Sequence, residues 1–155
     1  MKVKLKEARL WLKTFRITLL YLTVLWTVCL LPIPETPLSH VRLIDKWTHL
    51  VLFGGLSGLI WCEYAYRHRI LPARPLTVYS FVIPTVTGGA VEVVQHYCTA
   101  GMRSGDPIDF LADVIGTVLG LFIGIPAARY LSNRNTDGAA DANYKSGGHP
   151  SPPVR

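Results

Sequence analysis

The sequence contains 155 residues, of which 50% are hydrophobic and 17% carry a charge. This leaves too little polar surface for a water-soluble domain of this size, and the length allows one compact domain at most. The formal net charge is +6, but the basic residues lie between apolar blocks rather than in one stripe. We therefore expect no nucleic-acid partner.

The chain opens with a basic, partly amphipathic lead-in at residues 1–14, which is typical of a segment on an anionic membrane surface. Four apolar blocks follow, each near the length that a bilayer-spanning helix needs, at residues 15–31, 47–66, 76–97 and 108–131. The first block ends at Pro32 and Pro34, and Pro84 predicts a kink in the third. We therefore expect an all-α, polytopic membrane protein with a four-transmembrane-helix bundle over residues 15–131.

The fourth block carries Gly116, Gly120 and Gly124 at a four-residue spacing, which places them close to one helix face. The second block is also rich in small residues around Gly54 and Gly58. These stretches predict faces at which helices pack closely. The polar tail at residues 132–155 is rich in Gly, Ser and Pro and is expected to be disordered and cytoplasmic.

The distribution of basic residues predicts the orientation in the membrane. Of the 16 Lys and Arg residues, 13 lie before or at the start of the first block, between the second and third, or at and after the end of the fourth. The other two loops contain only 3, which are Arg42, Lys46 and Arg103. The positive-inside rule then predicts a protein of the bacterial inner membrane with both termini in the cytoplasm and those two loops outside.

Polar and ionisable residues from three distant segments fall at the outward-facing ends of the last three blocks. The candidate site residues are Asp45, His49, Glu92, Gln95, Arg103, Asp109 and Asp113. Several pairs, such as Asp109 and Asp113, are three or four residues apart and share a helix face. Ionisable groups inside a membrane helix are costly and tend to face the bundle interior. The pattern predicts one outward-facing polar pocket.

The same residues resemble the signatures of the VanZ-like membrane proteins, a family named for a teicoplanin-resistance protein. The segments DKWTH at 45–49 and EVVQ at 92–95 resemble its DKxxH and ExxQ motifs. Its pattern of an arginine, a short gap, an aspartate and a glycine-bearing helix is similar to Arg103, Asp106, Asp109, Gly116 and Gly120 here. The resemblance covers about residues 20–125. One departure is Asp113, where the family often has Asn and where the extra carboxylate changes the charge of the site.

Three interpretations of the pocket stay open at this point. Helix capping and an ion pair between Glu92 and Arg103 would make it purely structural. In acid–base chemistry, His49 or a carboxylate would act as the base and Arg103 would bind an anionic group. No cofactor is clearly implied, but His49, Glu92 and Asp113 are weak candidate ligands for a divalent metal, with His96 and Asp109 nearby, although no HExxH or CxxC spacing supports such a site.

The resemblance implies a protein of the cell envelope that, in some members, lowers glycopeptide susceptibility. We expect the pocket to act on or with a lipid-linked or peptidoglycan-related ligand, either by recognition or by catalysis. One alternative is a non-catalytic structural or partner-binding membrane component. Another is a small ion- or proton-coupled transporter, for which four short helices leave little room unless the protein oligomerises.

Overall fold

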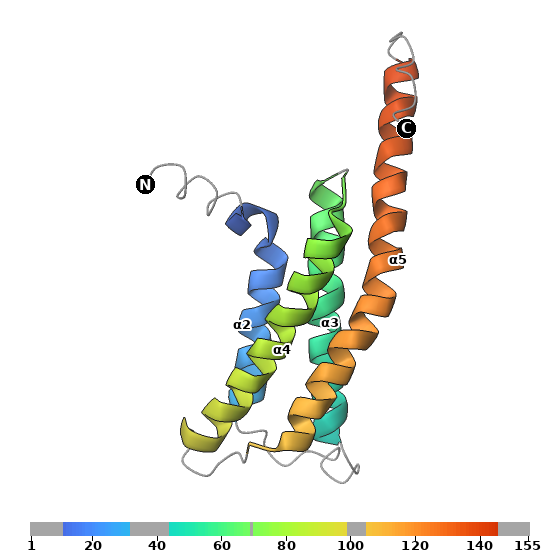
Figure 1. The fold of residues 1–155 in the computed structure, drawn as a ribbon. Coiled ribbons are helices and arrows are strands. Elements are labelled where there is room, and N and C mark those ends of the chain that lie inside the picture. Colours follow the sequence, from blue (N-terminus) through green and yellow to red (C-terminus); the bar gives the residue numbers. More distant parts are fainter. Residues whose placement is uncertain (1–10, 32–43, 69, 99–104, 146–155) are drawn as a thin grey trace.

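A computed structural model describes residues 11–31, 44–68, 70–98 and 105–145. The described chain is all-helical. Its helices are α2 (Arg16–Leu30), α3 (Ile44–Arg67), α4 (Ala73–Cys98) and α5 (Pro107–Lys145). Figure 1 shows them running side by side, with the start of α3, the end of α4 and the start of α5 at the same end of the bundle.

The helices form where the sequence predicts apolar blocks, and the first three differ from the predicted bounds by a few residues. The fourth differs more, because α5 continues through the polar residues 132–145, which the sequence analysis assigned to a disordered tail. This stretch of α5 has no proline, and it includes several alanines, which favour a helix even without apolar packing. Residues 146–155, the rest of the predicted tail, lie outside the described residues.

The glycine faces of α3 and α5 pack against each other, as their spacing predicts. A Cβ atom at Gly124 would lie 2.7 Å from the Cα atom of Gly58, and a Cβ atom at Gly120 would collide with the carbonyl oxygen of Gly54. Backbone atoms cannot move aside as a flexible side chain can, so only glycine permits this approach. The close packing fixes the register between α3 and α5, and with it the positions of the polar residues near their first turns.

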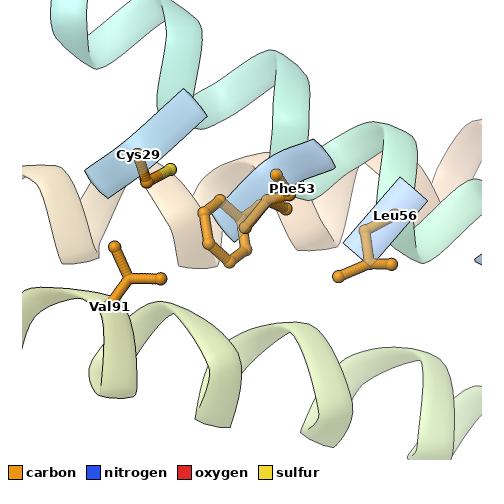
Figure 2. Close-up of a cluster of buried hydrophobic side chains, with 5 residues drawn as sticks. Cys29, Phe53, Leu56 and Val91 are labelled. Carbon is orange, nitrogen blue, oxygen red and sulfur yellow. The ribbon is translucent and has the colours of Figure 1, made fainter. Parts of the chain in front are cut away.

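Two clusters of buried apolar side chains fill the bundle. One joins α2, α3 and α4 and contains Leu25, Cys29, Phe53, Leu56 and Val91. Figure 2 shows Cys29, Phe53, Leu56 and Val91 between the three helices. The second cluster lies toward the other end of the bundle, around Trp61. The ring of Phe53 stacks on that of His49, with centroids 6.1 Å apart, so the first cluster closes the inner side of the polar region described below.

Two of the described helices are long and apolar enough to cross a membrane by length and composition. They are Ala73–Cys98 and the part of α5 from Pro107 to Gly138, while the apolar helix α2 is shorter. The surface of the bundle also carries many exposed large hydrophobic side chains, among them Leu20, Val51 and Phe122. The described part of the chain is therefore a helical bundle with an apolar exterior around a polar cluster.

Candidate functional site

The candidate site lies where α3 begins, α4 ends and α5 begins (Figure 1). It has an outer layer, in which Lys46 binds Asp106 and Asp109, and an inner layer of His49, Glu92 and Asp113. On α3, His49 lies four positions after Asp45, which corresponds to about 6 Å along the helix. On α5, Asp113 follows Asp109 by the same number of positions.

The first turn of α5 sets up the outer layer. Asp106 precedes Pro107, a residue favoured at the first helical position, and its Oδ1 accepts a hydrogen bond of 2.9 Å from the backbone N–H of Ile108. Asp106 is therefore the N-cap of α5. Its other carboxylate oxygen accepts a bond of 2.8 Å from Nζ of Lys46, which also donates one of 2.6 Å to Oδ1 of Asp109.

The charges of this outer layer shift the pKa values of its members in opposite directions. The hydrogen bond from Lys46 holds the pKa of Asp106 below its ordinary value, and the bond from the N–H of Ile108 adds to this effect. Burial alone would lower the pKa of Lys46, but the bonds to Asp106 and Asp109 outweigh burial and raise the pKa above its ordinary value. Lys46 is therefore a fixed cation that ties the start of α3 to the start of α5.

The inner layer centres on a buried histidine–aspartate pair. Nδ1 of His49 lies 2.9 Å from Oδ1 of Asp113, and the two side chains are 2% and 0% exposed. When Asp113 is ionised, its oxygen accepts a hydrogen bond from the Nδ1–H group. Such a bond holds the imidazole ring in one orientation.

Glu92 completes the inner layer from α4. Its Oε2 accepts a hydrogen bond of 2.7 Å from the backbone N–H of Asp106, while its Oε1 lies 3.9 Å from Nδ1 of His49. The N–H group therefore orients the carboxylate so that its second oxygen faces the histidine. Three helices that are distant in sequence each place one ionisable side chain at this point.

Among the described residues, two carboxylate oxygens of the inner layer have no hydrogen-bond partner, namely Oε1 of Glu92 and Oδ2 of Asp113. An unsatisfied buried polar group costs about 1–3 kcal/mol, and a charged group costs more. The other buried side-chain atoms without a partner among the described residues are neutral groups, on Ser57, Trp61, Thr85 and Thr117. The two carboxylate oxygens are thus the buried, unpartnered atoms of ionisable side chains in the described structure, and both lie in the candidate site.

Oδ2 of Asp113 faces α4 at Gly88, where a Cβ atom would approach this oxygen to 2.5 Å. Gly88 precedes Glu92 by one helical turn and lies on the same face of α4. The absence of a side chain at Gly88 therefore gives the Asp113 carboxylate the room that it occupies beside Glu92.

The remaining candidates take different positions. Gln95 is buried, but its Nε2 donates a bond of 2.8 Å to the carbonyl oxygen of Cys29 on α2, so this amide connects α4 to the end of α2. Ligand atoms of Asp45, His49 and Asp109 lie within 4.8 Å of one another, which places Asp45 beside the outer layer. Arg103 lies outside the described residues.

Glu63 on α3 is a buried ionisable residue that does not belong to the predicted site. Its Oε1 accepts a bond of 2.9 Å from the N–H of Ile17, and its Oε2 accepts bonds of 2.8 Å from the N–H and from the hydroxyl of Thr18. Phe15, the N-cap residue of α2, has no capping side chain, so Glu63 satisfies the free N–H groups of that helix instead. A lone carboxylate inside the second apolar block was the available signal, since such residues need a partner.

The geometry of the inner layer is compatible with two kinds of chemistry. A histidine oriented by a carboxylate is the arrangement that supports proton transfer, and one nitrogen with two carboxylates is a donor set for zinc and related divalent ions. No protein-family model matches the chain, and no curated protein or solved structure matches it either.

Proposed function

We propose that the chain is a multi-pass protein of the bacterial inner membrane that binds a lipid-linked or peptidoglycan-related ligand of the cell envelope. Its four helices span the bilayer with both termini in the cytoplasm, and the ligand reaches the cluster of His49, Glu92 and Asp113 from outside. The proposal includes membership of the VanZ-like family, which the motifs DKWTH and EVVQ support, and an effect on teicoplanin susceptibility.

The surface of the helices supports a membrane location. Only 22% of the most apolar window of α4 and 39% of that of α5 are buried inside the bundle. The core helix of a water-soluble protein would be mostly buried, whereas these helices present apolar side chains outward, such as Val86 and Ile123. A lipid environment accounts for that exposure without loss of stability.

The distribution of Lys and Arg supports the orientation. The loops on the side of the cluster contain 3 of the 16 basic residues of the chain. The positive-inside rule assigns this poorer side to the exterior. A ligand of the envelope is accessible there and a cytoplasmic ligand is not.

One observation carries the proposal of a ligand site, and it is the pair of unpartnered carboxylate oxygens on Glu92 and Asp113. A network that served packing alone would be expected to satisfy its buried oxygens, because each unsatisfied one destabilises the fold. Buried groups of this kind that lack partners are typical of functional sites.

The outer layer favours a structural role for part of the cluster. Lys46 satisfies both Asp106 and Asp109 and links two helices. A second candidate function is therefore a non-catalytic membrane component in which the ionisable residues fix the helices for a partner. Under this alternative, replacing Glu92 would change stability and would not change a phenotype at equal abundance.

The test is complementation of a deletion strain with wild type, with Glu92→Gln or with the control Asp137→Asn. Asp137 is an exposed carboxylate on α5, far along the chain from the cluster. Teicoplanin susceptibility is measured, and immunoblots of membranes establish equal abundance. We expect wild type and the control to restore the phenotype and Glu92→Gln to fail. Full complementation by Glu92→Gln at equal abundance would overturn the proposal.

A further inference from the structure

The charge of the inner layer does not match an anionic ligand. Its described members are two carboxylates, on Glu92 and Asp113, against one histidine, His49. Lys46 is already bound to the two aspartates of the outer layer. A phosphate or carboxylate of an envelope ligand would therefore meet repulsion from the inner layer unless that layer held a cation.

The distances within the inner layer suit a metal ion. Nδ1 of His49 lies 2.9 Å from an oxygen of Asp113 and 3.9 Å from an oxygen of Glu92, and one ligand atom of each residue falls within 4.8 Å of the other two. Nitrogen and oxygen ligands about 2.1 Å from zinc in a tetrahedral site are roughly 3.4 Å apart. The two separations from His49 lie on either side of that value, and the third is no greater than 4.8 Å, so side-chain movements would complete the site.

The unpartnered oxygens point to an occupant. Asp113 is fully buried, and its Oδ2 has no hydrogen-bond partner although it lies beside the helix that carries Glu92. Oε1 of Glu92 is likewise unpartnered and faces His49. Hydrogen bonding among the described residues leaves lone pairs unused on both carboxylates, whereas a metal ion takes lone pairs from carboxylates of this kind.

We propose that His49, Glu92 and Asp113 bind a divalent metal ion of the zinc class. The ion replaces the proton between Nδ1 of His49 and the Asp113 carboxylate, and three protein ligands leave a fourth position for water or for an anionic group of the ligand. The N–H of Asp106 keeps the Glu92 carboxylate oriented toward the ion. The metal site stands on geometry alone, but its contact with an envelope ligand rests on the proposed function.

A second group of possible ligands, Asp45, His49 and Asp109, shares the histidine. Lys46 donates a hydrogen bond of 2.6 Å to Oδ1 of Asp109. A cation at this point would be repelled by the ammonium group and would have to displace it. The inner group has no such competitor among the described residues, so it is the one that we assign.

The test uses the full-length protein purified in detergent, stripped with a chelator and titrated with Zn²⁺ alone. Bound zinc is counted by elemental analysis after dialysis, and thermal unfolding is followed with and without the metal. The variants are Asp113→Asn and Glu92→Gln. The control is Glu63→Gln, which changes a buried carboxylate at the other end of α3.

We expect wild type and Glu63→Gln to bind about one zinc ion per chain and to unfold at a higher temperature with zinc. Asp113→Asn and Glu92→Gln should bind at least about 10-fold more weakly, as the loss of one ligand implies. Co²⁺ should give visible absorption bands in wild type that both variants lack. Weak or absent binding in wild type, or unchanged binding in both variants, would overturn the metal site.

The two proposals fail in different ways. If wild type binds no zinc but Glu92→Gln still fails to complement, the ligand site stands without a metal. If zinc binds as expected but Glu92→Gln complements fully, the metal site stands and the proposed envelope function is wrong.

Discussion

Glu63 and Asp113 are both buried carboxylates, and they lie at opposite ends of the bundle. Glu63 is 4% exposed and accepts three hydrogen bonds at the start of α2. Asp113 is 0% exposed, and among the described residues one of its oxygens bonds to His49 while the other has no partner. The difference between the two residues lies in how fully their oxygens are satisfied, while their burial is nearly the same.

This contrast separates a structural role from a ligand-binding one. The donors to Glu63 are backbone and hydroxyl groups that would otherwise be unsatisfied at a helix end, so the carboxylate and α2 stabilise each other. The neighbours of Asp113 are another carboxylate and a histidine, which leave lone pairs unused. Loss of Glu63 should therefore affect folding, and loss of Asp113 should affect binding.

The largest expected effect on stability is that of Glu63→Ala. The change leaves the buried N–H group of Thr18 and the part-buried N–H group of Ile17 without an acceptor, and we expect it to lower the free energy of unfolding by about 3 kcal/mol. Glu63→Gln keeps one acceptor oxygen but places an NH₂ group where the other oxygen accepts a bond, so it should cost less than Glu63→Ala and more than nothing. Thermal unfolding in detergent measures both, and equal stability of wild type and Glu63→Ala would contradict the structural role.

A smaller effect is expected from Gly88→Ala. The new Cβ atom would lie 2.5 Å from Oδ2 and 3.0 Å from Cβ of Asp113, so the aspartate has to move. Overpacking of this kind costs about 1–3 kcal/mol, and here it should also weaken zinc binding.

Gly89→Ala is the matched control for this substitution. The nearest atom to its new Cβ atom is Cε2 of Phe110 at 3.6 Å, which is an ordinary contact. Both variants add one methyl group to α4, so the comparison isolates the contact with Asp113. Equal zinc affinity of the two variants would show that the position of this carboxylate does not matter.

The smallest effect concerns the outer layer and its dependence on pH. The pKa of Asp106 is lowered from 3.8 by Lys46, so its contribution to stability is present above pH 3.8 and is lost as the pH falls through the folded-state value. The pKa of Lys46 is raised from 10.5. Its contribution to stability is therefore fully present below pH 10.5 and is lost as the pH rises through the higher folded-state value.

The contribution of this ion pair to the unfolding temperature should therefore stay constant between about pH 5 and 9 and fall in acid. Asp106→Asn should remove part of the fall in unfolding temperature that acid causes. The unfolding temperature of the variant should still stay constant between about pH 5 and 9. Unfolding temperatures measured across pH for wild type and Asp106→Asn test this. An identical acid-induced loss in the two proteins would show that the pair does not contribute.

Much of the fold follows from apolar blocks, because block length and helix-breaking residues locate a helix without knowledge of its neighbours. The predicted block 47–66 lies within α3, and the glycine spacing of the fourth block identifies the face that meets α3. The helical continuation through residues 132–145 was not predictable in this way, because that stretch has no apolar periodicity to indicate a helix.

The site was predictable in part. The shared depth of His49, Glu92 and Asp113 brought them together in the prediction, and the distances between them agree with it. The directions of side chains cannot be read from periodicity, so the hydrogen bond from the Gln95 amide to the end of α2 was not predictable. The lone carboxylate of Glu63 inside an apolar block indicates that it needs a partner, but its partners, the N–H groups of Ile17 and Thr18 and the Thr18 hydroxyl, follow from no sequence motif.

Asp113→Asn tests the central claim most directly, because it removes the charge of the under-coordinated carboxylate and keeps its shape. The measurement is thermal unfolding of this variant beside wild type in detergent, together with complementation at equal membrane abundance. We predict an unfolding free energy within about 1 kcal/mol of wild type and no complementation. A large loss of stability with complementation retained would show that Asp113, like Glu63, is a structural residue.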